Sequence, residues 1–578
     1  MFKKKINLYL LITLLLAGLL RIWKLNKVPV SLFADELDVG YQAYSIIHTG
    51  RDYFGNLLPL HFHSYADFRA PFYIYSAIPT VAISGISAWG VRLPAAIFGT
   101  LGVLGIYLLV EEILKIEKFK AINGRKLAFV SALVLTFSPW HIQYSRAAFE
   151  VTELLFFYLI GFYFFFKFLR SRKYLWASVL SFSITPWIYS TAKLFTSLIF
   201  IFLFLAWRKD LIKLSMRQKL NTIIIAGVLW LPLLYANLFG GASFRFNYIS
   251  IFTNPTTPGE VQNLRLNDAR VRERYGGGIL QKVASRLIHN KYLFWSERIV
   301  DNYFKTASSE FLFVEGDPNL RHSINKIGQF YKIEAIALIL GAIFFFVSKT
   351  GRKLKLLISF WIFAGIFPSA LTRDGGNHAT RLILILPPLI FLISFGIIDS
   401  IDKLKGKLKY IIVVLYLGFW LLDFGLYQHL YWIHNPWYSE RSWHAGYKEA
   451  VLAAKKVEDD YGKIIFSNAS DDPRIFLASY YPYYPQLWQN GMLEETVPGF
   501  GNIEHMGKFY FGQVDGEIGI DKISDFLAMD TLYIAASREI QGNLIRDPGK
   551  VPQGLKLVES VSYPSGEPAF YLFERSEK

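Results

Sequence analysis

Residues 8–38 read LYLLITLLLAGLLRIWKLNKVPVSLFADELD, an apolar run that leads into a cluster of carboxylates. The run Leu8–Leu20 follows the lysines at positions 3–5 and precedes Arg21, without a small-residue cleavage site. We interpret it as an uncleaved first membrane span rather than a signal peptide. Apolar runs of roughly 13 to 22 residues recur along the chain, close to the ~20 residues that cross a hydrocarbon core. This recurrence predicts a polytopic α-helical membrane protein.

The composition agrees with this class. The chain has 578 residues, of which 53% are hydrophobic and 17% aromatic, and its mean hydropathy is +0.30. The net charge of +17 comes from Lys and Arg clustered in short segments between apolar runs, so it indicates membrane topology rather than a nucleic-acid partner. Cys is absent, which excludes disulfides, a thiol nucleophile and thiolate metal sites. No G-x-x-x-x-G-K-[ST] motif is found, which argues against an ATP-driven pump.

About eleven spans are predicted from the apolar runs. They are residues 6–23, 90–111, 127–139, 151–167, 174–187, 194–207, 220–238, 330–347, 355–370, 382–398 and 409–427. A further run, Pro71–Ser87, is ambiguous. If it does not cross, every basic loop falls on the side of the N-terminal lysines, namely loops 115–126, 167–173, 208–219, 349–355 and 403–409. The positive-inside rule therefore predicts a re-entrant or juxtamembrane helix at 71–87 and a cytoplasmic N-terminus.

This topology predicts two domains. Residues 1–430 form the transmembrane domain, and residues 431–578 form an extracytoplasmic α/β domain. The outer loops of the first domain are residues 24–89, 140–150, 239–329 and 371–381. In the second domain we expect a helix over 443–457, strands at 463–468 and 531–535, and a hairpin of 557–563 with 569–574, around Pro564-Ser565-Gly566.

The first outer loop opens with two adjacent carboxylates. Asp35 or Glu36 can act as a general base at the membrane surface, if it lies near the proton of its substrate. Alternatively, Asp35 is a helix N-cap with Asp38 at N3, where both charges favour the helix dipole. The two interpretations are compatible, because a cap fixes the position of the carboxylate. Neighbouring helix residues point about 100° apart, so both acids are not expected to face one substrate.

Other polar residues of the outer loops are candidates for binding a phosphate or another substrate group. Arg69 can hold a lipid phosphate, or it extends to the headgroups as many interfacial arginines do. His378 and Arg381 flank a helix start in a glycine-containing turn, which suits a phosphate, or they belong to an ordinary polar turn. Glu150 begins the next span and needs a partner near the membrane, or it is a simple N-terminal helix charge.

A metal is possible at Asp317 and His322, but no tight set of ligands recurs there. We therefore predict no metal site and no cofactor. Asp317 and His322 remain candidate substrate-binding residues, together with Arg146 and Arg321.

These short motifs, in this order and on this side of the membrane, resemble a known family. They are Asp35-Glu36 after the first span, Arg69-Ala70-Pro71, Val91-Arg92-Leu93-Pro94, Ser138-Pro139 with Arg146 and Glu150, Phe311-Leu312-Phe313 with Gly316-Asp317 and Arg321-His322, and His378 with Arg381 before Pro387-Pro388. Over residues 1–430 the chain resembles the bacterial glycosyltransferase family 39 proteins of the GT-C fold. These include lipid A aminoarabinose transferases and are relatives of the protein O-mannosyltransferases. Residues 431–578 resemble the appended domain of many members, without a motif.

The resemblance implies an inverting glycosyltransferase on the outer face of the bacterial cytoplasmic membrane. The donor would be a sugar on a polyprenyl phosphate, and the acceptor a lipid, a glycan or a protein. Asp35 would be the base, and Glu36 would support it or hold the fold of the loop. Glu150 stands where members often carry an Asp and would be a further acid. Arg69, His378 and Arg381 would stabilise the leaving phosphate, so neither a nucleotide nor a divalent metal is required.

Two alternatives from other classes remain. A transporter or flippase of lipid-linked glycans should carry ionisable residues at the membrane midplane and paired broken helices. In this chain the charges gather instead at the outer ends of the spans, which favours surface chemistry. A non-catalytic scaffold for envelope partners stays open, because residue types alone do not exclude it.

Overall fold

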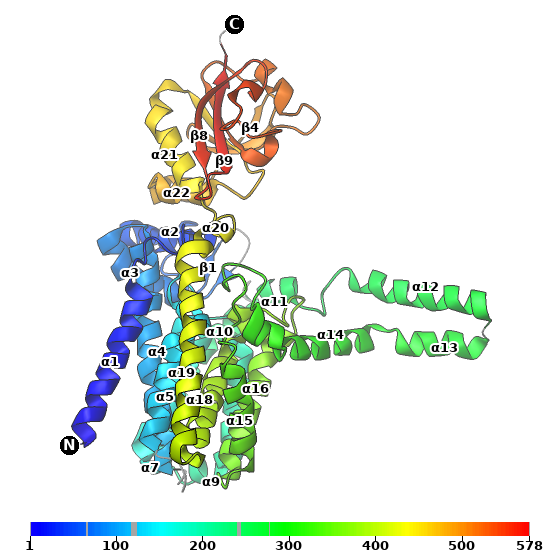
Figure 1. Ribbon diagram of the computed structural model, residues 1–578. Helices are drawn as coiled ribbons and strands as arrows, with labels where there is room; N and C mark the ends of the chain where they lie inside the picture. The colour runs from blue at the N-terminus through cyan, green and yellow to red at the C-terminus, as the bar shows by residue number, and fades with distance from the viewer. Residues whose placement is uncertain (1, 65–67, 117–123, 240–243, 277, 577–578) are drawn as a thin grey trace.

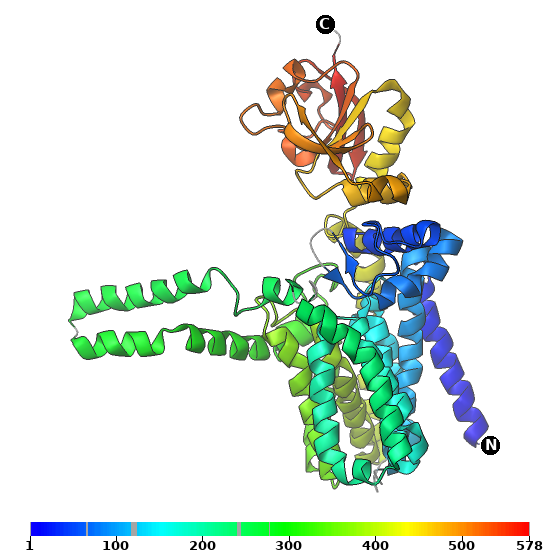
Figure 2. The same ribbon diagram turned by 180° about the vertical axis from the view of Figure 1, so that it is seen from behind.

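The structure, a computed structural model, describes residues 2–64, 68–116, 124–239, 244–276 and 278–576. Figures 1 and 2 show three parts: a long helical bundle, a sheet domain at one end of it, and a helical arm that projects sideways from the bundle. The helical membrane class and the separate C-terminal α/β domain predicted from the sequence are both confirmed.

Each of the eleven predicted spans coincides with a helix. These helices are α1 (Phe2–Ile22), α4 (Ala88–Ile116), α5 (Gly124–Phe137), α7 (Val151–Arg170), α8 (Leu175–Ile184), α9 (Ala192–Ile212), α10 (Met216–Phe239), α15 (Glu334–Val347), α16 (Arg352–Ala370), α18 (Leu386–Lys403) and α19 (Gly406–His429). Within the described residues, six helices are long and apolar enough to cross a membrane. They are Ala88–Ile116, Val151–Arg170, Met216–Ala236, Arg352–Ala370, Ala379–Lys403 and Gly406–Tyr438. The others are shorter or less apolar, so eleven crossings stay a prediction.

The ambiguous run forms α3 (Phe72–Ser84), which packs against α4 and α2 (Ala34–Thr49). Both α2 and α3 lie at the end of the bundle that carries the sheet domain (Figure 1). A short hairpin of β1 (Phe62–His63) and β2 (Phe68–Arg69) precedes α3. The first loop is therefore a small folded cap, and Arg69 is the last residue of β2, shortly before α3.

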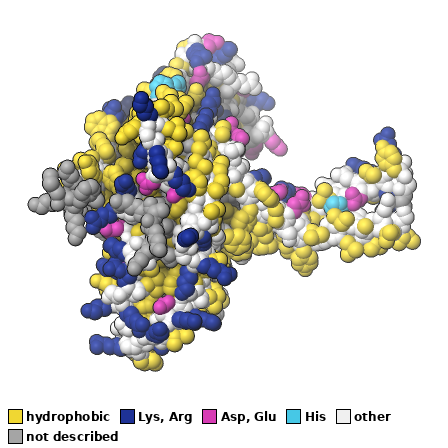
Figure 3. All heavy atoms as spheres, turned by 60° about the horizontal axis from the view of Figure 1, so that its bottom comes forward, with side chains coloured by type: hydrophobic (Ala, Val, Ile, Leu, Met, Phe, Trp, Pro, Cys, Tyr) yellow, Lys and Arg dark blue, Asp and Glu magenta, His cyan; other side chains and the backbone are white. Residues whose placement is uncertain are grey.

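The basic loops meet at the opposite end of the bundle. Polar contacts join them in pairs: Lys126 to Asp402, Lys353 to Asp210, and Arg172 to the carbonyl of Lys213. Figure 3, which brings this end forward, shows Lys and Arg side chains gathered over it. Part of the first predicted basic loop, residues 117–123, lies outside the described residues.

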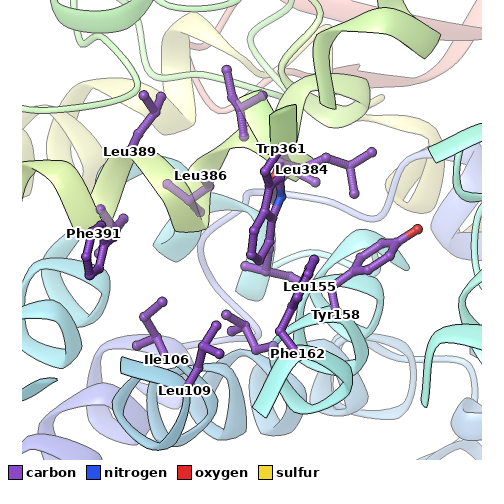
Figure 4. Close-up of a cluster of buried hydrophobic side chains, with 14 of the residues drawn as sticks. Ile106, Leu109, Leu155, Tyr158, Phe162, Trp361, Leu384, Leu386, Leu389 and Phe391 are labelled. Carbon is purple, nitrogen blue, oxygen red and sulfur yellow. The ribbon is translucent and has the colours of Figure 1, made fainter. Parts of the chain in front are cut away.

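The core of the bundle is aromatic and aliphatic. In Figure 4, Trp361 of α16 points toward Phe162 and Leu155 of α7, and the Trp361 and Phe162 rings stack with centroids 4.0 Å apart. The Trp361 indole N–H donates to the carbonyl of Leu384, 2.8 Å away. Gly341 of α15 and Gly396 of α18 let these helices touch, because a Cβ at either position would overlap a backbone carbonyl of the other helix.

The C-terminal domain is built on one mixed seven-stranded sheet in the order β4-β5-β6-β3-β7-β9-β8. The strands are β3 (Lys463–Phe466), β4 (Leu493–Val497), β5 (Gly501–Met506), β6 (Phe509–Phe511), β7 (Thr531–Ala536), β8 (Leu555–Ser562) and β9 (Pro568–Arg575). β3 runs parallel to β6 and β7, and the other pairs are antiparallel. The predicted helix is α21 (Tyr447–Val457), and β3, β7 and the β8–β9 hairpin match the predicted strands.

The arm is the largest feature that the sequence analysis treated only as a loop. Within residues 239–329 the structure has α11 (Phe244–Ile249), α12 (Thr257–Tyr275), α13 (Ile279–Ile288) and α14 (Lys291–Thr306). α12, α13 and α14 form the arm, and the end of α14 packs on α16.

Candidate functional site

The first polar group of the site lies where α2 begins. The guanidinium of Arg69 contacts Asp35 Oδ1 at 2.5 Å and Asp38 Oδ2 at 2.9 Å, so one cation bridges two carboxylates. The Asp35 side chain is 59% exposed, whereas that of Asp38 is buried. The Tyr53 hydroxyl donates to Asp38 Oδ1 at 2.6 Å. Burial raises the pKa of Asp38, and the Arg69 charge opposes this rise. Asp35 is thus the carboxylate that a substrate can reach.

Glu36 points in the other direction, into the protein. It is fully buried and forms a bidentate ion pair with Arg92 of α4, with both N···O distances 2.7 Å. The backbone N–H of Ala148 also donates to Glu36, at 2.8 Å. Arg92 further donates to the carbonyls of Leu25, Pro29 and Ser31. Glu36 therefore joins the first loop to α4 and to the second loop.

The second polar group surrounds Asp317. Its Oδ2 lies 2.9 Å from His322 Nδ1 and accepts the backbone N–H of Ala379 at 2.8 Å. The ring of His378 lies 5.0 Å from that of His322, centroid to centroid. Burial alone would raise the pKa of Asp317, but the hydrogen bond with His322 and the charges of His322 and His378 hold that pKa below its usual value.

Arg381 belongs to the same turn and is buried. Its guanidinium contacts Asp374 Oδ1 at 2.5 Å and donates to Thr372 Oγ1 at 2.8 Å. His378 Nε2 lies 4.0 Å from Asp374 Oδ2. Asp374 is 61% exposed, so its carboxylate is accessible to solvent. A phosphate that bound Arg381 would displace this carboxylate. The sequence analysis did not single out Asp374.

The two groups are joined by aromatic side chains and by Arg321. The Arg321 guanidinium lies 4.8 Å from the ring centroid of Phe33, two residues before Asp35. Phe33 lies 5.7 Å from Phe149, which lies 5.6 Å from the ring of His322. Side-chain contacts thus run from Phe33, two residues before Asp35, to His322, which contacts Asp317.

Two other predicted residues have different surroundings. Arg146 is fully buried and donates to the carbonyls of Leu20 and Val28 and to the hydroxyl of Tyr431. These contacts give Arg146 a structural role, away from any open surface. Glu150 is half-buried and stands directly before α7, one turn ahead of the buried Glu153.

The C-terminal domain contributes a residue that the sequence analysis missed. His444 Nδ1 accepts the backbone N–H of Ala34, the first residue of α2, at 3.2 Å, and its Nε2 lies 3.5 Å from Asp471 Oδ2. Burial lowers the pKa of His444, with Asp471 acting in the opposite direction, so the neutral acceptor form is favoured. Next to it, the buried Trp443 packs edge-on against Phe33. No local sequence signal connects His444 to a helix 410 residues earlier.

The same domain docks along the rest of α2. The Tyr41 hydroxyl donates to the carbonyl of Tyr483 at 2.9 Å, and the Gln489 amide donates to the carbonyl of Asp52 at 2.9 Å. Trp488 packs against the rings of Tyr41 and Tyr53. The helix that carries Asp35 is therefore held from one side by the bundle and from the other by the C-terminal domain.

A cavity of about 350 Å³ lies elsewhere, between α5, α15, α18 and α19. Its lining is almost entirely apolar, with Glu334 and Ser400 among the few polar residues, and it includes none of the predicted site residues.

Asp317, His322 and His378 offer a carboxylate oxygen and two ring nitrogens that all lie within 4.8 Å of one another. This set has the donor types of a divalent-metal site. However, Asp317 already accepts hydrogen bonds from the backbone N–H groups of Asn319 and Ala379 and contacts His322. The sequence analysis found no tight set of ligands, because His378 is distant in the sequence from Asp317 and His322, whereas the structure brings the three together.

No protein-family model and no curated protein matches the chain. Solved structures similar to it include the apo oligosaccharyltransferase of Archaeoglobus fulgidus, at 14% identity and a TM-score of 0.47, with 82% of this chain covered. This chain spans 64% of the length of that protein. Another is ArnT from Cupriavidus metallidurans bound to undecaprenyl phosphate, at 10% identity and a TM-score of 0.49, with 98% of each chain covered.

A third similar structure is the Pmt1–Pmt2 protein O-mannosyltransferase complex of S. cerevisiae bound to its sugar donor. Identity is 17%, the TM-score is 0.30, and 40% of this chain and 32% of that chain are covered. ArnT and the protein O-mannosyltransferase are of the kinds that the sequence motifs resemble.

Proposed function

We propose that this chain is an inverting glycosyltransferase of GT-C type, which moves a sugar from a polyprenyl-phosphate donor to a lipid, glycan or protein acceptor. The observation that carries this proposal is the exposed Asp35 held by Arg69 at the end of a membrane-type bundle. A carboxylate in contact with a cation stays ionised and can accept a proton, while the same cation is within reach of an anionic leaving group. Residues of this kind, beside apolar helices, suit a substrate with a phosphate head and a lipid tail.

In this proposal Asp35 removes the proton of the acceptor hydroxyl or amine as that atom attacks the anomeric carbon of the sugar. The bond from this carbon to the phosphate oxygen breaks, and the polyprenyl phosphate leaves with one more negative charge. Arg69 and His378 stabilise that charge directly, and Arg381 does so once the phosphate displaces Asp374. Attack opposite to the leaving group inverts the anomeric centre.

The remaining site residues support this arrangement. Glu36 holds the first loop through Arg92, and Glu150 is assigned to the acceptor side at the start of α7. Asp317 and His322 position His378, and Arg321 over Phe33 connects the donor and acceptor sides. Arg146 acts only through the fold, since its donors are all engaged by carbonyls and by Tyr431.

The proposed location is the cytoplasmic membrane, with the basic end of the bundle inside and the C-terminal domain outside. The contacts among the basic loops place them at one end, and such loops are retained in the cytoplasm. We therefore expect alkaline phosphatase fused after Lys578 to be active, and a fusion after Lys213 to be inactive. The reverse pattern of activities would contradict this orientation.

The function is tested by mass spectrometry of envelope lipids, glycans and proteins from cells with and without the chain. The expected result is the loss of one sugar modification, and its recovery when the parent gene is returned. In vitro, the purified protein should release polyprenyl phosphate from a polyprenyl-phosphate sugar only when the acceptor is present. Unchanged envelope sugars would contradict the transferase. If the protein also accelerated the movement of lipid-linked glycan across vesicle membranes, it would be a flippase instead.

Removal of divalent metal is expected to change the transfer rate by no more than about twofold, because Arg69 and Arg381 supply the positive charge that a metal otherwise would. The measurement is the initial rate after EDTA treatment, with metal content determined in parallel. Loss of activity that is restored by one divalent ion in the parent, but not in Asp317→Asn, would instead assign a metal to the Asp317 cluster.

His444→Ala is expected to lower kcat about fivefold with little change in KM. The variant removes a cap of the helix that carries Asp35, and the loss of such a cap costs about 1 kcal/mol. His444→Gln should restore most of the rate, because its amide oxygen can accept the same N–H. Since the pKa of His444 is lowered, the cap is present at neutral pH and is lost only as the pH falls below 6.5.

The matched control is His48→Ala, at the far end of the same helix, where His48 contacts the carbonyl and ring of Tyr44 and the ring of Tyr484 but no group near Asp35. This variant should keep the parent kcat. If His444→Ala lowered the thermal midpoint but left the kcat of the folded protein unchanged, His444 would be structural only.

A further inference from the structure

The arm of α12, α13 and α14 is a two-layered unit that leaves the side of the bundle near the C-terminal-domain end (Figures 1 and 2). α12 forms the layer on the side of the C-terminal domain, and α13 with α14 forms the layer on the side of the bundle. Polar contacts hold the layers together: Arg298 with Glu260 at 3.0 Å, and His289 with Asp268 at 3.1 Å. The polar sides of the two layers therefore face each other.

The layer on the bundle side carries apolar side chains that no part of the described chain covers. In α13 they are Ile279, Leu280, Val283 and Leu287, at helical spacing, and Leu280 and Leu287 are 82% and 68% exposed. In α14 they are Leu293, Val300 and Phe304, also at helical spacing and exposed. Figure 3 shows hydrophobic side chains along much of the arm. A contiguous exposed strip of this kind indicates a surface that is buried against something else.

The base of the arm sets its height relative to the membrane. The ring of Tyr303 stacks on Phe363 of α16, with centroids 5.4 Å apart, and its hydroxyl donates to the carbonyl of Phe363. Asn302 donates to the carbonyl of Ala370, the last residue of α16. Since α16 is long and apolar enough to cross a membrane, its end marks the membrane surface, and the arm extends sideways at that level. The apolar strip then faces the edge of the hydrocarbon layer.

The charge of the arm also fits a membrane surface as its partner. Residues 257–306 contain nine Lys and Arg against five Asp and Glu. α13 and α14, the layer on the side of the bundle, carry five Lys and Arg against two Asp and Glu. Tyr292 and Trp295 of α14 are of the residue types that gather at the headgroup level. Amphipathic helices with basic side chains bind the interface of membranes that contain anionic lipid.

We propose that the arm is a membrane-surface paddle: α13 and α14 lie in the headgroup region of an anionic bilayer, with their apolar strip toward the acyl chains. The proposal rests on the position of the arm and does not depend on the proposed sugar transfer. It assigns a partner, the lipid surface, to α13 and to the exposed side of α14. The end of α14 also contacts the turn that carries His378 and Arg381, because Asn302 and Thr306 donate to the carbonyls of Thr372 and Gly376.

The absence of Cys makes the test direct, because single cysteines can be introduced into the full chain and labelled with an environment-sensitive fluorophore. The test positions are Leu280→Cys and Leu287→Cys on the apolar strip. The matched controls are Gln281→Cys on the other side of α13 and Asn263→Cys on α12. Each variant is reconstituted in vesicles of phosphatidylcholine with phosphatidylglycerol, with and without brominated acyl chains.

The expected result is blue-shifted emission at positions 280 and 287, with quenching by brominated lipid and protection from aqueous iodide. At positions 281 and 263 we expect no blue shift, no quenching by brominated lipid, and quenching by aqueous iodide. Iodide quenching at 280 and 287 equal to that at 281 would overturn the proposal. Protection at 280 and 287 from both iodide and brominated lipid would also overturn it, because a second copy of the chain would then cover the strip. Equal quenching in pure phosphatidylcholine would remove the role assigned to the basic side chains.

Discussion

Asp35→Asn is expected to reduce sugar transfer by about 10²–10⁴-fold or more, because the amide cannot accept the acceptor's proton. The change preserves shape, and the amide oxygen can still contact Arg69, so the loss should come from chemistry rather than from folding. The measurement is the initial rate of transfer by purified protein, with membrane insertion and thermal midpoint determined on the same sample. kcat should fall much more than KM changes.

A matched control is Asp459→Asn, the same substitution on an exposed residue of the C-terminal domain. It should transfer sugar at the parent rate. A folded Asp35→Asn protein that works as fast as the parent would remove Asp35 from the mechanism and return the choice of base to Glu150, since Glu36 is buried against Arg92.

Arg92→Met is expected to destabilise the protein by about 3–5 kcal/mol, because it leaves the Glu36 carboxylate buried without its counter-charge. The carbonyls of Leu25, Pro29 and Ser31 lose a donor at the same time. The expected readout is a large fall of the thermal midpoint in detergent and a smaller monodisperse fraction after purification.

Two further variants separate this effect from a loss of packing. Glu36→Leu combined with Arg92→Met should recover part of the stability, because apolar residues of similar volume often replace a buried ion pair without cost. Lys556→Met breaks a pair with Glu574 at the surface of the C-terminal domain and should change the midpoint little. If Arg92→Met lowered the thermal midpoint as little as Lys556→Met, the Glu36–Arg92 pair would not be what stabilises the first loop.

The limits of sequence reasoning are clearest at Asp35 and Glu36. The two acids are neighbours with the same local signals, and the 100° step of a helix predicts only that they diverge. Which of them faces outward depends on Arg92, 56 residues later, and on the backbone of Ala148. Arg146 shows the same limit: it was a candidate substrate-binding residue, and its burial among carbonyls follows from contacts with Leu20 and Val28.

In two places a local signal existed and was not used. The spacing of Ile279, Leu280, Val283 and Leu287 is that of an amphipathic helix, although residues 239–329 were treated as a loop. Asp374 stands in the turn already singled out for His378 and Arg381, and its pairing with Arg381 follows from their nearness in sequence. His444 had no such signal, because its partner at Ala34 lies in another domain of the chain.

By itself the sequence determined the membrane class, the positions of the apolar helices, the gathering of basic loops and the strands at the centre and edge of the C-terminal sheet. These features depend on hydrophobicity, charge and periodicity over a few turns of chain, which can be counted residue by residue. Only the tertiary structure decided that Arg69 bridges Asp35 and Asp38, that Glu36 turns inward, and that His444 caps the helix of the proposed base. Such pairings depend on how distant segments pack, and burial then selects which charges find partners.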